Sequence, residues 1–344
     1  MTSIIRLQNL LAIVILIVLN ACKQTPESIH EKESIDNPVV AIVIHGGAGS
    51  ITQSSLSVER ELAYKQKLEE AINLGYSILE DGGSAGDAVE QTIKLLEDSP
   101  LFNAGKGAVF NSNGENELDA SFMDGKTMNS GAVTGVKHIK NPIVAARRVM
   151  DSCKHVMLSG VGAEQFAEEQ QLEIVDNKYF FTQDRYEGLI NVKSREESEK
   201  EIYQKDEKRG TVGAVAIDKD GNIVAGTSTG GLTNKKYGRI GDSPIIGAGT
   251  YANNKTCGVS CTGVGEYFIR TLAAHDVSAL MEYKGLSLED AIKTVIDKIG
   301  TMGGDGGIIG LDFHGNVAWY FNTSGMFRGY KSSKQGTEVQ LYGN

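Results

Sequence analysis

The sequence predicts an α+β protein in which β-sheets are sandwiched and helices pack on their outer faces. The chain has an apolar run at Val39–Ile44, then two stretches with helical spacing, and later an apolar hairpin around Asp220-Gly221. Hairpin-linked strands that stand beside separate helical blocks are typical of this class, because each sheet has a face that helices must cover.

The first half is predicted to contain one buried strand, helices and a strand pair. Val39–Ile44 is almost wholly β-branched, as in a strand buried on both faces. Residues 58–79 and 87–96 have helical spacing and are separated by Gly82-Gly83. Residues 118–123 and 130–136 are predicted to be paired strands, and 142–150 a helix with Pro142 in its first turn.

The second half begins after a stretch of mixed charge. Residues 184–209 have few apolar anchors and are predicted to form a solvated loop. Strands at 211–217 and 223–227 form the hairpin. Helices at 266–283 and 287–299 follow, and strands at 308–313 and 317–321 are joined by the turn His314-Gly315-Asn316.

Composition narrows the classes of ligand. The chain has 344 residues, 40% of them apolar, and can therefore bury a sizeable core. Its formal net charge of -10 provides no basic field that would attract phosphates. We therefore expect small molecules or peptides, and no nucleic acid, as ligands.

The amino terminus has the pattern of a targeting segment. Arg6 precedes the apolar run 10–19, which is too short to span a bilayer. The run ends in Leu19-Asn20-Ala21-Cys22, which resembles a bacterial lipobox with Cys22 as the lipidated residue. This predicts a signal peptide at 1–21, a tether at 22–37 and a lipid-anchored protein of the cell envelope; an uncleaved anchor is the alternative.

The other cysteines and the histidines do not predict a metal site. Cys153, Cys257 and Cys261 lack paired metal-ligand spacing and are expected to be small buried apolar residues. Pairing of Cys257 with Cys261 remains open, since spacing alone does not determine disulfide geometry. Six scattered histidines form no zinc motif.

Thr211 is the candidate nucleophile. It follows Gly210 and the charged stretch, and it starts a predicted buried strand. If the Gly210-Thr211 bond is cut, the new α-amino group has an ordinary pKa of about 7.7–8.0 and can act as the general base for the hydroxyl. The same hydroxyl can attack the Gly210 carbonyl and make the cut. By itself, however, a Gly-Thr pair before a strand is weak evidence.

Many further blocks occur in order along the chain. The blocks are His45–Gly49, Leu101–Gly105, Leu118–Ser121, Met123–Gly125, Asn141-Pro142, Gly210–Val215, Thr227–Lys235, Gly238–Pro244, Gly247–Ala252 and Cys261–Glu266. Together they resemble the plant-type asparaginase and isoaspartyl peptidase family of N-terminal nucleophile hydrolases, and the resemblance covers nearly all of residues 38–344.

The resemblance implies an architecture and an activity. The expected fold is a four-layer αββα sandwich. The expected products of self-cleavage are an α subunit of residues 38–210, ending in a flexible linker at about 184–209, and a β subunit of residues 211–344. Two such αβ units would form a dimer, (αβ)2. The expected reaction is hydrolysis of β-aspartyl dipeptides and L-asparagine through an acyl-enzyme on Thr211.

The same resemblance implies roles for individual residues. Thr262 and Gly263 match the oxyanion hole and bind substrate, while Thr229 matches a threonine that positions the nucleophile. Arg239 matches the anchor of the substrate α-carboxylate and Asp242 the partner of its α-ammonium group. Asn103 is expected to orient the processed terminus.

No cofactor is expected for the chemistry, but a structural sodium ion is. The loop 96–106 matches a stretch that binds sodium in relatives through backbone carbonyl oxygens, which suit a hard cation. The predicted ligand residues are Leu96, Glu97, Ser99, Phe102, Ala104 and Lys106.

Parts of the sequence also fit other classes of protein. Gly226–Gly230 fits the G-x-S-x-G nucleophile elbow, but the residues after it are too polar and glycine-rich to open the required helix. Gly46–Gly49 lacks the glycine spacing of a dinucleotide site. Glycosylasparaginase is the alternative enzyme, although Gly210 and Gly230-Gly231 favour the isoaspartyl branch. A binding protein without catalytic activity is the alternative from another class.

Overall fold

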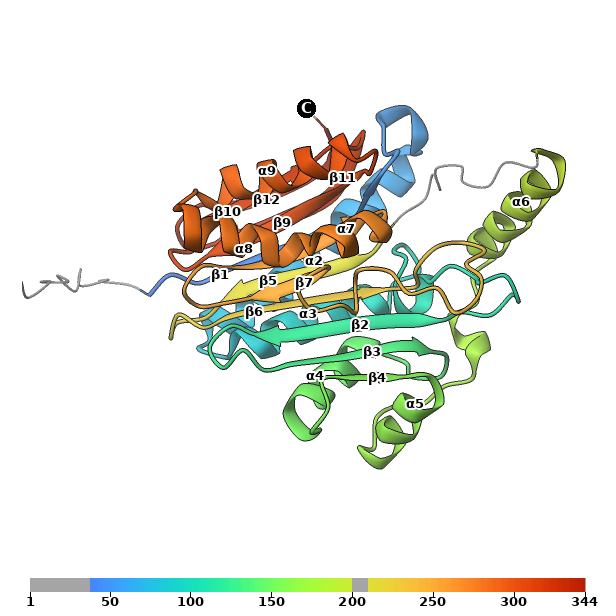
Figure 1. Cartoon of the computed structure of the whole chain (residues 1–344), viewed down its shortest axis with the longest axis horizontal. Coiled ribbons are helices and arrows are strands. Elements are labelled where there is room, and N and C mark those ends of the chain that lie inside the picture. Colours follow the sequence, from blue (N-terminus) through green and yellow to red (C-terminus); the bar gives the residue numbers. More distant parts are fainter. Residues whose placement is uncertain (1–37, 200–209, 344) are drawn as a thin grey trace, which may run out of the picture. The chain divides into compact units, whose positions relative to one another are not determined.

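The computed structural model describes residues 38–199 and 210–343. This part of the chain folds into two β-sheets with helices against them (Figure 1). The strands are β1 (Ala41–Gly49), β2 (Leu118–Asp124), β3 (Ser130–Val136), β4 (Met157–Ser159), β5 (Val212–Ile217), β6 (Ile223–Thr229), β7 (Thr250–Ala252), β8 (Cys257–Gly263), β9 (Gly306–Asp312), β10 (Val317–Phe321), β11 (Gly325–Ser332) and β12 (Gly336–Tyr342). The helices are α2 (Val58–Glu80), α3 (Ala85–Glu97), α4 (Pro142–Ser152), α5 (Gly160–Glu169), α6 (Gln183–Glu199), α7 (Gly265–Thr271), α8 (Ala273–Lys284) and α9 (Leu288–Thr301), with short 3-10 turns at Gln53–Ser55, Gly105–Gly107 and Asn177–Phe180.

The larger sheet has the strand order β12-β11-β1-β5-β6-β2-β3-β4, and the smaller one β10-β9-β8-β7. Every neighbouring pair is antiparallel except β3 and β4, which are parallel. The predicted hairpin is β5-β6, and it lies at the centre of the larger sheet. The α+β class with two sheets and flanking helices is therefore confirmed.

Strand β1 shows why both of its faces had to be apolar. Ile42 and Ile44 belong to a core with helices α2, α3 and α4, while Ala41 and Val43 belong to a second core that includes Ile309 of β9. Successive side chains of a strand point to opposite faces, so β1 serves both cores. A third core joins the smaller sheet to α8 and α9. Burying each such side chain contributes roughly 1.5–3 kcal/mol.

Serine residues set the start of three helices. The Ser57 hydroxyl accepts from the N–H of Arg60 at α2, and Ser84 and Ser287 do the same for the residue three positions on at α3 and α9. Such a cap satisfies one of the amide groups that has no partner inside the helix and is worth about 1 kcal/mol. These starts agree with the predicted helices to within two residues.

The segment predicted to form one helix forms two helices instead. The spacing at 266–283 predicts a single helix, but α7 and α8 meet at Leu272, whose φ of 49° and ψ of 50° are left-handed. The first amides of α8 explain the turn: Ala274 N–H donates to the Ala248 carbonyl and His275 N–H to that of Gly247. Contacts with a distant loop thus redirect a segment whose own pattern is continuous.

The predicted charged loop at 184–209 is partly wrong. Residues Gln183–Glu199 form helix α6, which is visible as a separate rod in Figure 1. The Gln183 amide donates to Glu187 one turn on, and Tyr186 makes an edge contact with Phe110. A helix with few apolar residues relies largely on such pairs, and Leu189, which is 2% exposed, adds one buried side chain. Residues 200–209 lie outside the described part of the chain.

Candidate active site

Thr211 and Thr229 meet at one end of the central hairpin. Thr211 stands directly before β5, and Val212 pairs with Ser228 across the β5-β6 ladder. The two threonines therefore fall at the same end of neighbouring strands, and their Oγ1 atoms are 3.0 Å apart. Thr229 is buried and Thr211 half-buried. The predicted nucleophile and the predicted positioning threonine are therefore within hydrogen-bond distance of each other.

Asn103 holds the chain on both sides of this pair. Its backbone N–H donates to the Gly210 carbonyl at 2.7 Å, and its own carbonyl accepts from Gly230 at 3.0 Å. Its side-chain amide donates to Gly231 O and accepts from Val109 N–H. All four bonds are within the normal range, so Asn103 links the residue before the nucleophile to the loop after β6.

Thr262 lies across the sheets from Thr211. Strand β8 crosses β5 closely, and two approaches define the crossing: Gly258 against Val215, and Ser260 against Gly213. Moving two residues further along β8 and two back along β5 leads to Thr262 and Thr211 on the facing sides, because alternate residues share a face. Thr262 is 1% exposed, and Gly263 ends the same strand. By this alternation, Thr262 lies on the side of β8 that faces β5.

Gly213 makes this crossing possible. A Cβ at Gly213 would lie 2.0 Å from Ser260 Oγ and 2.4 Å from His45 Nε2. We expect Gly213→Ala to lower the free energy of unfolding by at least about 1–3 kcal/mol, the usual cost of overpacking a core. Thermal unfolding measures this. The matched control is Gly162→Ala in α5, where a Cβ meets nothing within 4 Å; equal losses in both variants would contradict the tight crossing.

Arg239, Asp242 and Glu266 form a charged cluster at the start of α7. Arg239 Nε and Nη2 donate to Oε1 and Oε2 of Glu266, both at 2.9 Å. Gly265 lets the chain pass between the other two: a Cβ there would be 2.9 Å from both Arg239 Nη2 and Asp242 Oδ1. The structure thus brings the two predicted anchors together and adds Glu266, whose role the sequence did not predict.

Asp242 has a buried carboxyl group with one oxygen that lacks a hydrogen-bond partner among the described residues. It is 5% exposed, and its Oδ2 has no hydrogen-bond partner among the described residues. Burial raises its pKa to about 7; the nearby Arg239 lowers it, whereas Glu266 and Asp119 raise it further. An unpaired carboxylate oxygen away from water is costly, and a bound ammonium group would relieve that cost.

The loop 96–106 contains a second buried carboxyl group. Glu97 Oε1 accepts from the Ser228 hydroxyl at 2.6 Å and from Ile143 N–H, while its Oε2 has no partner among the described residues. Burial raises the pKa of Glu97 to about 8. Because Ser228 is on β6, donates to Glu97 and is not followed by a helix, the nucleophile-elbow interpretation fails.

The thiols on β8 are structural. Cys257 and Cys261 are buried and unpaired, and they face the core with α8 and α9. Burial raises the pKa of Cys257 to about 12, so its thiol stays protonated. Among the described residues, no group of three or more histidine, cysteine and acidic side chains could hold a metal ion.

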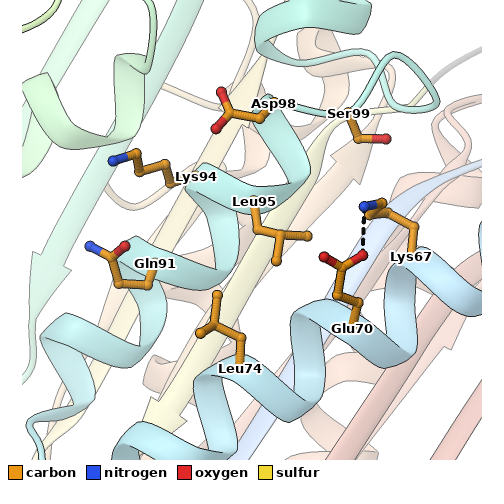
Figure 2. Close-up of a pocket in the computed structure, with 8 residues that line it drawn as sticks. All are labelled: Lys67, Glu70, Leu74, Gln91, Lys94, Leu95, Asp98 and Ser99. Carbon is orange, nitrogen blue, oxygen red and sulfur yellow. Dashed lines mark hydrogen bonds and ion pairs between the residues drawn. The ribbon is translucent and has the colours of Figure 1, made fainter.

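One cavity of about 340 Å³ lies between α2 and α3 (Figure 2). Its lining residues are Lys67, Glu70, Leu74, Gln91, Lys94, Leu95, Asp98 and Ser99. Figure 2 shows that Lys67 is paired with Glu70 at its rim. The predicted catalytic and substrate-binding residues do not line it, so it is not the candidate active site.

Comparison with known proteins identifies the family of this chain. The asparaginase family model matches residues 38–341. The chain belongs to the asparaginase family. This confirms the resemblance stated above and, with it, the class of amide hydrolases.

Relatives from three kingdoms match this asparaginase-family chain over most of its length. It is 50% identical over 295 residues to an isoaspartyl peptidase of Escherichia coli (strain K12), covering 84% of this chain and 92% of the relative. It is 44% identical over 329 residues to a probable isoaspartyl peptidase/L-asparaginase 2 of Arabidopsis thaliana, covering 88% and 98%. It is 41% identical over 298 residues to an isoaspartyl peptidase/L-asparaginase of Bos taurus, covering 84% and 92%.

The prediction of a lipoprotein is wrong by the same comparison. The relatives from Escherichia coli and Salmonella typhimurium are isoaspartyl peptidases, and their matches support neither a signal peptide nor a lipid-anchored envelope location. The lipobox resemblance rests on a short apolar run and a few residues before Cys22. Such a pattern is much less specific than a match to known proteins over most of the chain. Residues 1–37, with Cys22, lie outside the described residues; in the described ones, no helix is both long and apolar enough to cross a bilayer.

Proposed function

We propose that this asparaginase-family chain is an isoaspartyl peptidase and L-asparaginase that cuts itself before Thr211 and then uses Thr211 as its nucleophile. The observation that carries the proposal is the 3.0 Å approach of the Thr211 and Thr229 hydroxyls at the end of the central hairpin. The names of the relatives support the substrate class.

Self-cleavage begins when the Thr211 hydroxyl oxygen attacks the Gly210 carbonyl carbon. The amide C–N bond breaks, the nitrogen takes up a proton, and an ester joins Gly210 to the Thr211 side chain. Water then hydrolyses the ester, which frees the Thr211 hydroxyl and leaves Gly210 with a terminal carboxylate. The Asn103 N–H, 2.7 Å from the Gly210 oxygen, supports this step because it stabilises the negative charge that develops there. The products are the α subunit, 38–210, and the β subunit, 211–344.

Hydrolysis of substrate repeats the chemistry with an external amide. The freed α-amino group takes the hydroxyl proton, and the Thr211 oxygen attacks the side-chain carbonyl of the aspartyl unit. Thr262 and Gly263 stabilise the oxyanion, and the leaving amine departs with a proton. Water then releases aspartate from the acyl-enzyme. Thr229 positions the nucleophile, in keeping with its distance from it.

Arg239 and Asp242 recognise the free aspartyl head group. The buried Asp242 Oδ2 without a partner favours an ammonium ligand. Glu266 occupies two N–H groups of Arg239, but a guanidinium has five, so it retains capacity for the substrate α-carboxylate. Glu266 also keeps the fork of Arg239 in one orientation.

The complete assembly is proposed to be a dimer of αβ units, (αβ)2, each with the four-layer αββα sandwich. The three apolar cores, two between helices and a sheet and one between the sheets, support this layering.

The loop 96–106 is proposed to bind a structural sodium ion. The backbone carbonyls of Leu96, Glu97, Ser99, Phe102, Ala104 and Lys106 would be its ligands. Glycines leave space around two of these oxygens: a Cβ at Gly105 would be 2.4 Å from Glu97 O, and one at Gly107 2.1 Å from Phe102 O. Carbonyl oxygens are ligands suited to such a cation, so the residues fit the ion.

A comparison of substrates tests the proposed activity. We expect the processed enzyme to hydrolyse β-aspartyl-leucine and L-asparagine, because both carry the free α-ammonium and α-carboxylate groups that Asp242 and Arg239 recognise. N-acetylglucosaminyl-asparagine is the third substrate, and release of aspartate is measured for each. Turnover of the glycosylated substrate alone would identify a glycosylasparaginase instead.

A further inference from the structure

A buried row of hydrogen bonds runs from the carbonyl of Thr211 through His45 to three hydroxyl groups. The ring of His45, on β1, makes the first two bonds: its Nδ1 lies 3.0 Å from Thr211 O and its Nε2 2.9 Å from Ser260 Oγ. Ser260 is 2.7 Å from Thr227 Oγ1, which accepts from Thr250 at 2.6 Å. His45, Ser260, Thr227 and Thr250 are each 0% exposed, so water does not compete for these bonds.

The protons of this row can be assigned from one end. A backbone carbonyl only accepts, so His45 Nδ1 must carry the proton that it donates to Thr211 O. Burial lowers the pKa of His45 to about 3, which keeps the imidazole neutral and leaves Nε2 as an acceptor. Ser260 must therefore donate to Nε2, which leaves its oxygen as the acceptor in the 2.7 Å contact with Thr227. The Thr227 hydroxyl also lies 3.1 Å from Gly249 O, so its proton is shared between these two acceptors. The hydrogen bond at one ring nitrogen determines the tautomer at the other.

The hydrogen bond from His45 Nδ1 to Thr211 O contributes most to the position of Thr211 after cleavage. In the intact chain, the covalent bond to Gly210 and the hydrogen bond of Gly210 O to Asn103 hold its N-terminal side. Cleavage removes that connection, and the regular ladder begins only at Val212. The hydrogen bond from His45 Nδ1 to Thr211 O then fixes the backbone of the terminal residue directly.

We propose that His45 is a positioning residue of the processed enzyme, holding Thr211 in place through its carbonyl, and that Ser260 keeps the imidazole oriented toward that carbonyl by donating to its Nε2. The proposal rests on the proposed role of Thr211. Without Ser260, Nε2 is a buried acceptor with no donor, and the ring loses the hydrogen bond that fixes its orientation. The bond from Nδ1 to the Thr211 carbonyl then weakens, and the terminal residue is held less firmly.

Two matched serine variants test the proposal. Ser260→Ala removes the donor to His45, while Ser278→Ala removes a hydroxyl that is equally buried and 2.6 Å from Thr256 Oγ1 but outside the row. Each is purified in processed form, and kcat and KM are measured with β-aspartyl-leucine. We expect Ser260→Ala to lower kcat about tenfold, the order expected for losing one well-placed hydrogen bond, with KM within about twofold of wild type. Ser278→Ala should change neither.

A double-mutant cycle separates positioning from general loss of structure. In His45→Asn, the side-chain Nδ2 takes the place of Nδ1 and can donate to Thr211 O, and no ring nitrogen remains for Ser260 to hold. We therefore expect the tenfold effect of Ser260→Ala to shrink to about twofold or less in the His45→Asn background. An undiminished effect there, or equal losses of kcat in Ser260→Ala and Ser278→Ala, would overturn the proposal.

The wild-type enzyme distinguishes this failure from failure of the proposed function. A wild-type chain that stays uncut and inactive on all three substrates would refute the role of Thr211 itself. A processed and active wild type, with Ser260→Ala equally active, would refute only the positioning role of His45. Extent of processing is read from the masses of the two subunits in every variant.

Discussion

Replacing Thr211 with alanine is expected to leave the chain in one piece and to abolish hydrolysis. The same hydroxyl makes the cut and attacks the substrate, so one substitution removes both steps. Loss of a nucleophile costs about 10^4-fold or more in kcat, and here the general base is never released either. Mass spectrometry of the purified protein after prolonged incubation and aspartate release from β-aspartyl-leucine measure the two effects.

Two companion variants sharpen this test. Thr211→Ser keeps a hydroxyl at the same place and should still process, though more slowly. Thr294→Ala on the exposed side of α9 removes a threonine hydroxyl that bonds only within its own helix, and it should behave as wild type. If the Thr211→Ala variant were still cut into two subunits, Thr211 would not be the residue that makes the cut. An intact wild-type chain would favour the rival binding protein.

Replacing Asp242 with asparagine is expected to raise KM by about 100-fold, because the substrate ammonium would lose its buried charged partner. It should also change the pH dependence. The pKa of Asp242 is raised to about 7, so the carboxyl group is mostly neutral below pH 7 and ionised above it. An ammonium ligand pairs with the ionised form, so kcat/KM of the wild type should rise as pH increases through about 7.

The charges around Asp242 determine this direction. Arg239 favours its ionised form; Glu266 and Asp119 oppose it, and burial opposes it most strongly. Cys261 nearby is neutral, since burial keeps its pKa well above the ordinary value. The α-amino group of Thr211 also titrates, at about pH 7.7–8.0 if unperturbed, but it does so in both wild type and Asp242→Asn. The difference between the two pH profiles therefore isolates Asp242.

Asp220→Asn, in the exposed turn between β5 and β6, is the matched control and should leave KM and the pH profile unchanged. Steady-state kinetics with L-asparagine between pH 5.5 and 9 provide the measurement. If Asp242→Asn kept both the wild-type KM and the rise near pH 7, Asp242 would not be the ammonium partner.

Local patterns were sufficient for most elements but not for their ends or joints. The strand β1, the hairpin β5-β6 and helix α2 follow from apolar periodicity, turn residues and serine caps, which act over a few residues. The strands β4, β7, β8, β11 and β12 were not predicted. β8, Cys257–Gly263, alternates small apolar with small polar residues, and its burial depends on partners supplied by β5 and β9.

The amino-acid sequence by itself determined the family, the candidate nucleophile Thr211 and the pair Arg239 and Asp242, because these are ordered blocks of residues whose chemistry is local. Only the tertiary structure decided which groups hold them. His45 and Ser260 are 215 positions apart in the chain, and their bond exists because β8 crosses β5 at Gly213. Glu266 meets Arg239 through the start of α7. Contacts across sheets arise from packing geometry, which periodicity within a segment does not encode.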